Sequence, residues 1–171
     1  MIGRRCLKFN EIGMQMSEYT PHTIAHWFLC NIDREAGDSI THLKLQKLVY
    51  YAQAWSMVLL EKELFSEDFQ AWAHGPVAPS LFQTYRGSGW EALAAPDECP
   101  KIKDEYKEVL KDVLATYGQK SAKYLERLTH SEAPWKDARG GLAPEEYSQE
   151  PISKASIIKY YDKVYRESVD G

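Results

Sequence analysis

The chain has 171 residues and a mass of 19.7 kDa, the size of one domain, and its composition of 44% hydrophobic and 27% charged residues is typical of a globular protein rather than a disordered one. Twenty-one Lys and Arg against 25 Asp and Glu give a net charge of −4, which does not favour nucleic acid or an anionic membrane as a partner. No apolar run approaches the roughly 20 residues that a membrane span requires, so we expect no membrane association.

Residues 1–16 have the character of an N-terminal extension, which we expect to be flexible. They begin with a positive pair but lack the apolar stretch of a signal peptide, and Met14 and Met16 are alternative start positions. Three scattered cysteines form no CxxC pair. The sequence therefore predicts a cytoplasmic protein with neither a disulfide framework nor a zinc site at Cys6, Cys30 and Cys99.

Helical periodicity dominates residues 17–171, which we interpret as a single domain. A helix is expected to begin at Thr20-Pro21, where a hydroxyl cap precedes a proline at the first helical position. A second helix, from about Thr41, is apolar on most sides, which is typical of a helix that its neighbours surround. The strongest signal covers residues 102–117, and a last amphipathic helix begins near Ser153.

The helical period disappears between residues 64 and 79. Phe69, Ala71 and Ala73 alternate with polar or larger residues, which indicates a short strand, and Gly75-Pro76 breaks it. Short helices are expected from Pro79 and after Ser121, with a further cap at Ser131. The predicted fold is mainly α: a single compact helical domain with a minor short antiparallel β element near residues 64–78.

The histidines are the first candidates for catalysis or metal binding. His22 and His26 have helical i,i+4 spacing, but they lack the glutamate of an HExxH zinc motif. His74 and His130 lie at element boundaries, where a histidine can act as an acid or a base, but the chain has no GxSxG nucleophile turn. Hydrogen bonding at turns is the favoured role for both. We therefore predict no catalytic residue, no cofactor and no metal site; a small hydrolase or nuclease using His74 and His130 is the alternative.

A nucleic-acid-binding role is also disfavoured. The lysines between residues 101 and 123 alternate with acidic residues, as on a solvated helix surface. No helix shows the unpaired Arg, Asn or Gln of a recognition helix, so a transcriptional regulator is a third and weaker hypothesis. No direct contact with nucleic acid is expected.

Three strings in one order resemble a known family. They are LKLQKLVYYAQAW at residues 43–55, FQAWAHGPVAP at residues 69–79 and LTHSEAPW at residues 128–135. Together they resemble the Panacea domain, also described as the SocA-like antitoxin domain and found in GepA-type phage-associated proteins. The resemblance covers about residues 20–165; the first 15 or so residues and the lack of an appended DNA-binding domain depart from it.

The resemblance implies a cytoplasmic antitoxin of bacteria, phages or mobile elements. Its expected partner is a cognate toxin protein encoded nearby, neutralised by direct contact, with a cellular protease as a further partner if the protein delivers its toxin for degradation. It implies no catalytic residues and does not identify the toxin.

The candidate partner-binding residues are aromatic or lie where the chain is expected to turn in the second and third strings, near residues 74–79 and 130–135. Trp72 is either a binding hot spot or a buried residue, and the sequence leaves both open. The full set of candidates is Trp72, His74, Pro76, Tyr85, His130 and Trp135.

Overall fold

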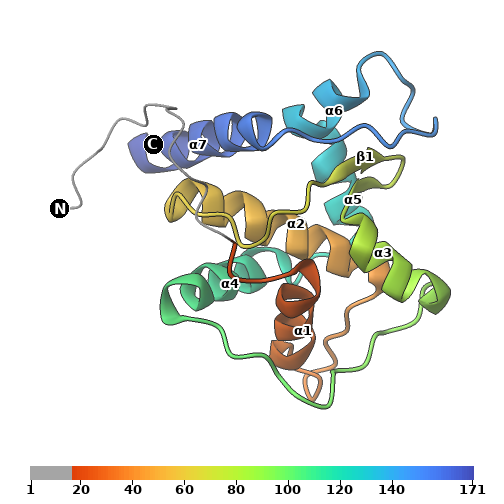
Figure 1. Ribbon diagram of the computed structural model, residues 1–171, viewed down its shortest axis with the longest axis vertical. Coiled ribbons are helices and arrows are strands. Elements are labelled where there is room, and N and C mark those ends of the chain that lie inside the picture. Colours follow the sequence, from red (N-terminus) through yellow and green to blue (C-terminus); the bar gives the residue numbers. More distant parts are fainter. Residues whose placement is uncertain (1–16) are drawn as a thin grey trace.

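The computed structural model describes residues 17–171, and these form seven α-helices, one 3-10 turn and two short strands (Figure 1). The prediction of a mainly α fold with a small antiparallel sheet is confirmed. The predicted extension at residues 1–16 lies outside the described residues. In chain order the elements are α1 (Pro21–Asn31), α2 (His42–Leu59), β1 (Gln70–Trp72), β2 (Gly75–Val77), α3 (Pro79–Tyr85), η1 (Arg86–Ser88), α4 (Asp104–Tyr117), α5 (Ala122–Ser131), α6 (Ala133–Arg139) and α7 (Lys154–Asp170).

Helix α2 is the centre of the fold. Its first turn is capped by the Thr41 hydroxyl, which accepts a hydrogen bond from the backbone N–H of Lys44. Most of its side chains are buried, and it packs against α1, α3, α4, α5, α7 and β2. Figure 1 shows α7 on one side of α2, with α1 and α4 on the other. A helix that is apolar on most sides is stable in water only in such a position.

The two strands form an antiparallel hairpin in which Gln70 pairs with Val77 and Trp72 pairs with Gly75. Gly75-Pro76, expected to break the strand, instead begins β2, because the chain turns at residues 73–74. A third extended segment lies along β1 without being a named strand. Its backbone forms hydrogen bonds of 2.8 Å from Ala71 N to Glu150 O and of 2.7 Å from Ile152 N to Phe69 O. The irregular segment before α7 is therefore fixed to the hairpin.

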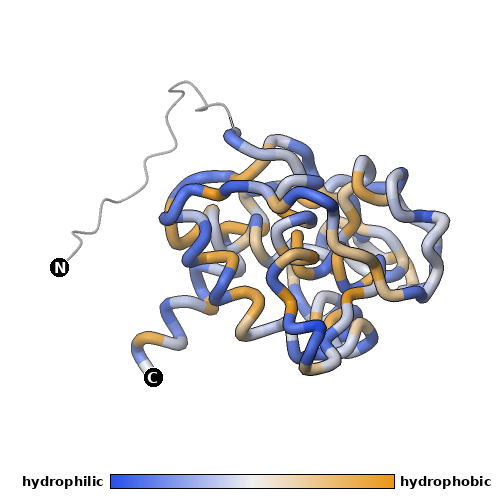
Figure 2. Tube along the Cα trace, turned by 90° about the horizontal axis from the view of Figure 1, so that it is seen from below, coloured by the Kyte–Doolittle hydropathy of each residue, from blue (hydrophilic) through white to orange (hydrophobic). Residues whose placement is uncertain are grey.

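The buried apolar side chains form one cluster to which all seven helices contribute. Figure 2 shows hydrophobic stretches gathered in the body of the fold and hydrophilic ones around its edge. An aromatic group between α2, α4 and α7 surrounds a buried carboxyl, that of Glu132, which accepts hydrogen bonds from the hydroxyls of Tyr51 and Tyr161. Among residues 17–171, no helix is both long enough and apolar enough to cross a lipid bilayer.

Two further details of the sequence interpretation are wrong. Cys30 and Cys99 form a disulfide across 69 residues, with Cα atoms 6.0 Å apart, where no disulfide was expected. Their wide spacing gave no sign that the loop before α4 returns to the end of α1. The second error is the cap at Ser131. This residue is the last of α5, where its hydroxyl donates to the Leu128 carbonyl oxygen. Glu132 occupies the N-cap position of α6 and makes no side-chain capping bond.

Candidate protein-docking site

An open groove of about 390 Å³ lies where the hairpin turn, the first turns of α2, helix α3 and two loops meet. The surface that lines it is mostly apolar. Trp72 and His74, two of the predicted partner-binding residues, are among the lining residues. The complete lining is His42, Leu43, Gln46, Trp72, Ala73, His74, Val77, Phe82, Gly89, Trp90, Tyr147 and Ser148. We call this the hairpin groove.

The aromatic rings on the inner side of the hairpin groove pack on one another. The Phe82 ring has its centroid 4.7 Å from that of Trp72 and 5.5 Å from that of His42. The indole N–H of Trp72 donates to the Gln70 side chain. Burial, with a smaller effect of the Lys47 charge, lowers the pKa of His42 to about 4. His42 is therefore neutral at neutral pH, and this side of the groove is uncharged and aromatic.

Two strongly exposed aromatic residues line the outer part of the groove. Trp90 is 68% exposed and Tyr147 is 77% exposed, and neither ring contacts another aromatic ring among the described residues. Single exposed apolar residues are ordinary, but here two rings from separate loops stand at one apolar pocket. Such a cluster is typical of a surface that binds a partner.

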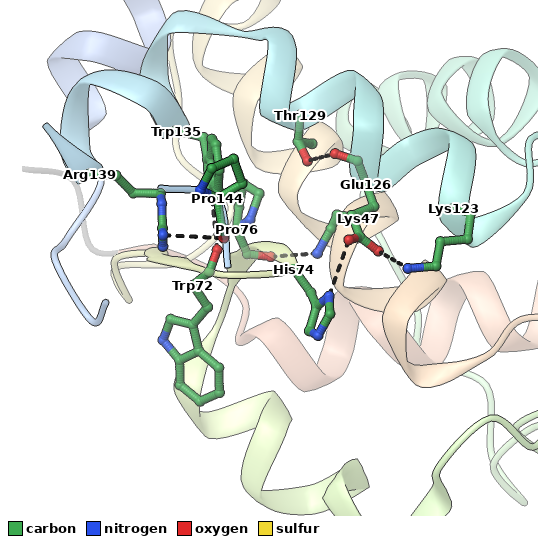
Figure 3. Close-up of polar contacts among 10 residues, drawn as sticks. All are labelled: Lys47, Trp72, His74, Pro76, Lys123, Glu126, Thr129, Trp135, Arg139 and Pro144. Atoms are coloured by element: carbon green, nitrogen blue, oxygen red, sulfur yellow. Dashed lines mark hydrogen bonds and ion pairs between the residues drawn. The ribbon is translucent and has the colours of Figure 1, made fainter. Parts of the chain in front are cut away.

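Arg139 fixes the loop that carries Tyr147. This side chain is buried, and its guanidinium donates to the carbonyl oxygens of Ala71, Ala143, Pro144 and Glu146 at distances of 2.6–3.3 Å. It also lies 4.7 Å from the ring centroid of Trp135. Figure 3 shows Arg139 beside Trp135, with its bond to the Pro144 carbonyl oxygen. One cation therefore joins α6, β1 and the Tyr147 loop.

The loop that carries Trp90 is held at two other points. Leu93 N donates to the Ile40 carbonyl oxygen at 2.8 Å, beside a β-bridge between Thr41 and Ala92. Further along, the disulfide joins Cys99 to the end of α1. Both rims of the hairpin groove are thus attached to the body of the fold by bonds outside the groove itself.

An ionic cluster lies beside the hairpin turn (Figure 3). Glu126 accepts from His74 Nδ1 at 3.1 Å and from Lys123 Nζ at 3.2 Å. Burial opposes ionisation of Glu126, but these two hydrogen bonds outweigh it and lower its pKa. Lys47 is fully buried and donates to the Pro76 carbonyl oxygen at 3.1 Å; burial lowers its pKa to about 7, and Glu126 partly offsets this. The cluster supports the turn on which His74 is displayed.

His130 does not share a site with His74. Its ring stacks on Trp135, with the centroids 4.0 Å apart, and it does not line the hairpin groove. Burial lowers its pKa. In the described part of the chain, no hydrogen bond joins the two histidines, and no group of three or more His, Cys, Asp or Glu side chains is arranged to hold a metal ion.

The structure divides the six predicted partner-binding residues into three groups. Trp72 is half-buried and His74 is exposed, and both line the hairpin groove. Tyr85 packs near His42, outside the lining. Pro76 and Trp135 are buried and His130 is half-buried, so these three lie behind the surface.

The sequence analysis missed Trp90 and Tyr147, the two most exposed aromatic residues of the groove. Each is a large ring in a loop with no periodic partner, next to glycine or proline-containing turns. That position was the available signal, since an aromatic residue outside any helical stripe has no predicted place in a core.

Residues 45–136, more than half of the chain, match the family model described as "Antitoxin SocA-like, Panacea domain". The chain belongs to this family. It is also similar to a protein named Antitoxin SocA from Caulobacter vibrioides (strain NA1000 / CB15N), with 30% identity over 113 residues. That alignment covers 56% of this chain and 58% of the relative, so the chain spans little more than half of the relative's length. No solved structure matches the chain significantly.

The matched region begins within the first turn of α2, contains the hairpin, α3, α4 and α5, and ends within α6. It includes most of the residues that line the hairpin groove, Trp90 among them. His42 and Leu43 lie before the matched region, and Tyr147 and Ser148 lie after it. The three family strings thus lie in α2, in the hairpin and at the junction of α5 and α6. The resemblance inferred from these strings is confirmed.

Proposed function

We propose that this protein is a cytoplasmic antitoxin that neutralises a toxin encoded by a neighbouring gene, and that it acts by binding the toxin directly. Membership of the antitoxin family supports the role. The observation that carries the mode of action is the hairpin groove, an apolar pocket with two exposed aromatic rings. Clusters of this kind supply large contact area at small entropic cost, which suits protein binding.

The groups along the groove suit binding better than catalysis. His74 is engaged with Glu126, and His42 is hydrogen-bonded to Gln46 at 3.1 Å. The Ser148 hydroxyl accepts from the backbone N–H of Glu150. None of the histidines in the lining is hydrogen-bonded to a serine or cysteine nucleophile among the described residues, which a covalent mechanism requires. The protein is therefore proposed not to be an enzyme.

The six predicted residues have different roles in this proposal. Trp72 and His74 contact the toxin, and Tyr85 supports His42 from the side. Pro76, His130 and Trp135 act indirectly, because they hold the hairpin in place from behind. In a reducing cytoplasm Cys30 and Cys99 would be held as neighbouring thiols, with the other attachments of the Trp90 loop intact.

Co-expression with the genomic neighbour tests the proposal. The neighbour alone should suppress growth, the pair should restore it, and the two proteins should co-purify. Expression of the antitoxin should be titrated, because a binder rescues growth only when its amount matches that of the toxin. Rescue at a small fraction of the toxin level, lost in a folded His74→Ala or His130→Ala variant, would instead support the hydrolase or nuclease alternative.

A protease-deficient host separates two modes of neutralisation. A protein that delivers its toxin to a protease also acts at low dose, but it fails when that protease is missing. A direct inhibitor rescues growth equally in both hosts. We expect dose-matched rescue that does not depend on the protease.

A further inference from the structure

We propose that the hairpin groove binds a basic segment of the partner protein, with one large apolar side chain of that segment seated between the Trp90 and Tyr147 rings. This deepens the proposed function, since it names the chemistry of the toxin surface that the groove takes. Three observations carry it: the charge of the two rim loops, the neutral aromatic interior and the size of the groove.

Both rim loops are acidic and contain no cation. Residues 87–99 and 140–150 include no Lys or Arg, although these residue types make up 21 of the 171 in the chain. Glu91 directly follows Trp90, and Glu145 and Glu146 directly precede Tyr147; all three carboxylates are exposed. The remaining acidic residues of the two loops are Asp97, Glu98 and Glu150. A negative rim around an apolar pocket complements a positive partner.

The same charge argues against other occupants. If a second copy of this chain docked through the same face, it would bring its own acidic loops against these, and like charges in an interface are unfavourable. Nucleic acid and anionic lipid carry negative charge, and the rim would repel them as well. A cationic protein segment is the partner that the rim attracts.

The interior of the groove selects the side chain. No Lys, Arg, Asp or Glu is among the lining residues, and the Trp72, Phe82 and His42 rings form an uncharged wall. A volume of about 390 Å³ is near the lower end of the range for ligand pockets, about 300–1,000 Å³. The groove therefore takes a single large side chain rather than a whole helix, because a helix is about 10 Å wide and needs more room.

A displayed library of random 12-residue peptides tests this without knowledge of the toxin. The library is selected against the full chain and counter-selected against the Trp90→Ala/Tyr147→Ala double variant. Both residues are largely exposed, so the variant should fold as the parent does. We expect the enriched peptides to share a large aromatic or aliphatic residue and a positive net charge.

Defined variants then separate the two parts of the proposal. In fluorescence anisotropy, Trp90→Ala should weaken binding of an enriched peptide at least tenfold. The Glu145→Gln/Glu146→Gln variant should weaken it severalfold at low salt and reduce its salt dependence. Matched controls change exposed residues elsewhere: Tyr124→Ala for the aromatic ring and Glu108→Gln for the charge, both of which should bind as the parent does.

Enrichment of neutral or acidic peptides, enrichment that survives the counter-selection, or no enrichment at all would overturn the inference. The antitoxin function can stand without it. If the Trp90→Ala/Tyr147→Ala variant still rescues growth from the toxin, the antitoxin function stands and the role of the groove is rejected. If basic peptides are enriched but the protein never rescues growth, the groove proposal stands and the antitoxin function is rejected.

Discussion

The indole nitrogen of Trp135 donates a hydrogen bond of 2.8 Å to the backbone carbonyl oxygen of Trp72. This bond joins α6 to the end of β1, immediately before the turn that displays His74. Trp135 is 4% exposed, and its ring lies between the His130 ring and the Arg139 guanidinium. Trp135 therefore positions the backbone of Trp72, the tryptophan that lines the hairpin groove.

Trp135→Phe should lower the free energy of unfolding by about 1–2 kcal/mol, since it removes the N–H donor and keeps most of the ring. Trp135→Ala should lower it by about 3–5 kcal/mol, because it also leaves a cavity. Urea denaturation followed by circular dichroism measures both values. Trp90→Ala is the matched control: its ring is exposed, and the change should stay within about 0.5 kcal/mol. Equal losses for Trp90→Ala and Trp135→Ala would contradict this division of roles.

Most of the helices could be predicted because their signals are local. The all-round apolar pattern from residue 42 to 59 predicted a central helix, and proline at the first position marked the beginnings of α1 and α3. The alternation before Gly75-Pro76 located β1 to within a few residues, but Gly75 and Pro76 belong to β2 and do not break the sheet. Each of these features depends on residues that lie close together in the sequence.

The features that could not be predicted depend on contacts between distant segments. Cys30 and Cys99 are brought together only by the return of the loop before α4. Arg139 looks like an ordinary surface residue in the sequence, but its bonds reach β1 and the loop after α6. The hairpin groove likewise needs Trp90 and Tyr147, which are 57 positions apart in the sequence, to line the same pocket.

Gly75→Ala should destabilise the protein by about 2 kcal/mol or more. The residue has φ of +100°, a conformation that costs a side-chain-bearing residue about 1–2 kcal/mol. A Cβ atom there would lie 2.6 Å from Lys47 Cε and 2.8 Å from Thr129 Oγ1, and both neighbours are buried. Thermal unfolding measures the loss. Gly141→Ala, with open space around its Cβ, is the control and should leave the melting temperature nearly unchanged. Tolerance of alanine at Gly75 would show that the hairpin turn and Lys47 can move apart.

Glu132→Gln should change how stability depends on pH. Burial raises the pKa of Glu132 to about 7, although the hydrogen bonds from Tyr161 and Tyr51 act in the opposite direction. An unfolded glutamate has a pKa of about 4.3, so between about pH 4 and pH 7 the unfolded chain loses this proton and the folded chain keeps it. Stability from this group is complete below pH 4 and falls by about 3 kcal/mol as the pH rises to 7.

The comparison must be made between the variant and the parent, because His42 acts in the other direction. Its folded pKa of about 4 lies below the ordinary value of 6.5, so its contribution to stability rises with pH between these two values. His42 is present in both proteins and cancels in the difference. Relative to the parent, Glu132→Gln should therefore gain about 3 kcal/mol in unfolding free energy between pH 4 and pH 8. A difference that stays constant with pH would show that Glu132 is already ionised in the fold.

Reduction of the Cys30–Cys99 bond should lower the unfolding free energy by about 2–4 kcal/mol, because the bond closes a loop of about 70 residues and restricts the unfolded chain. Chemical denaturation with and without a phosphine reductant measures this change. Cys99→Ser should show the reduced stability without the reductant and no further loss with it. Cys6→Ser is the matched control, and it should keep the full response to the reductant because the paired cysteines remain. A response that disappears in Cys6→Ser would assign the disulfide to a different pair.

Because the disulfide lies at the end of the loop that carries Trp90, its reduction should also affect the mobility of that loop. In the reduced protein, amide hydrogens between residues 94 and 101 should exchange faster, whereas those of α2 should exchange as before.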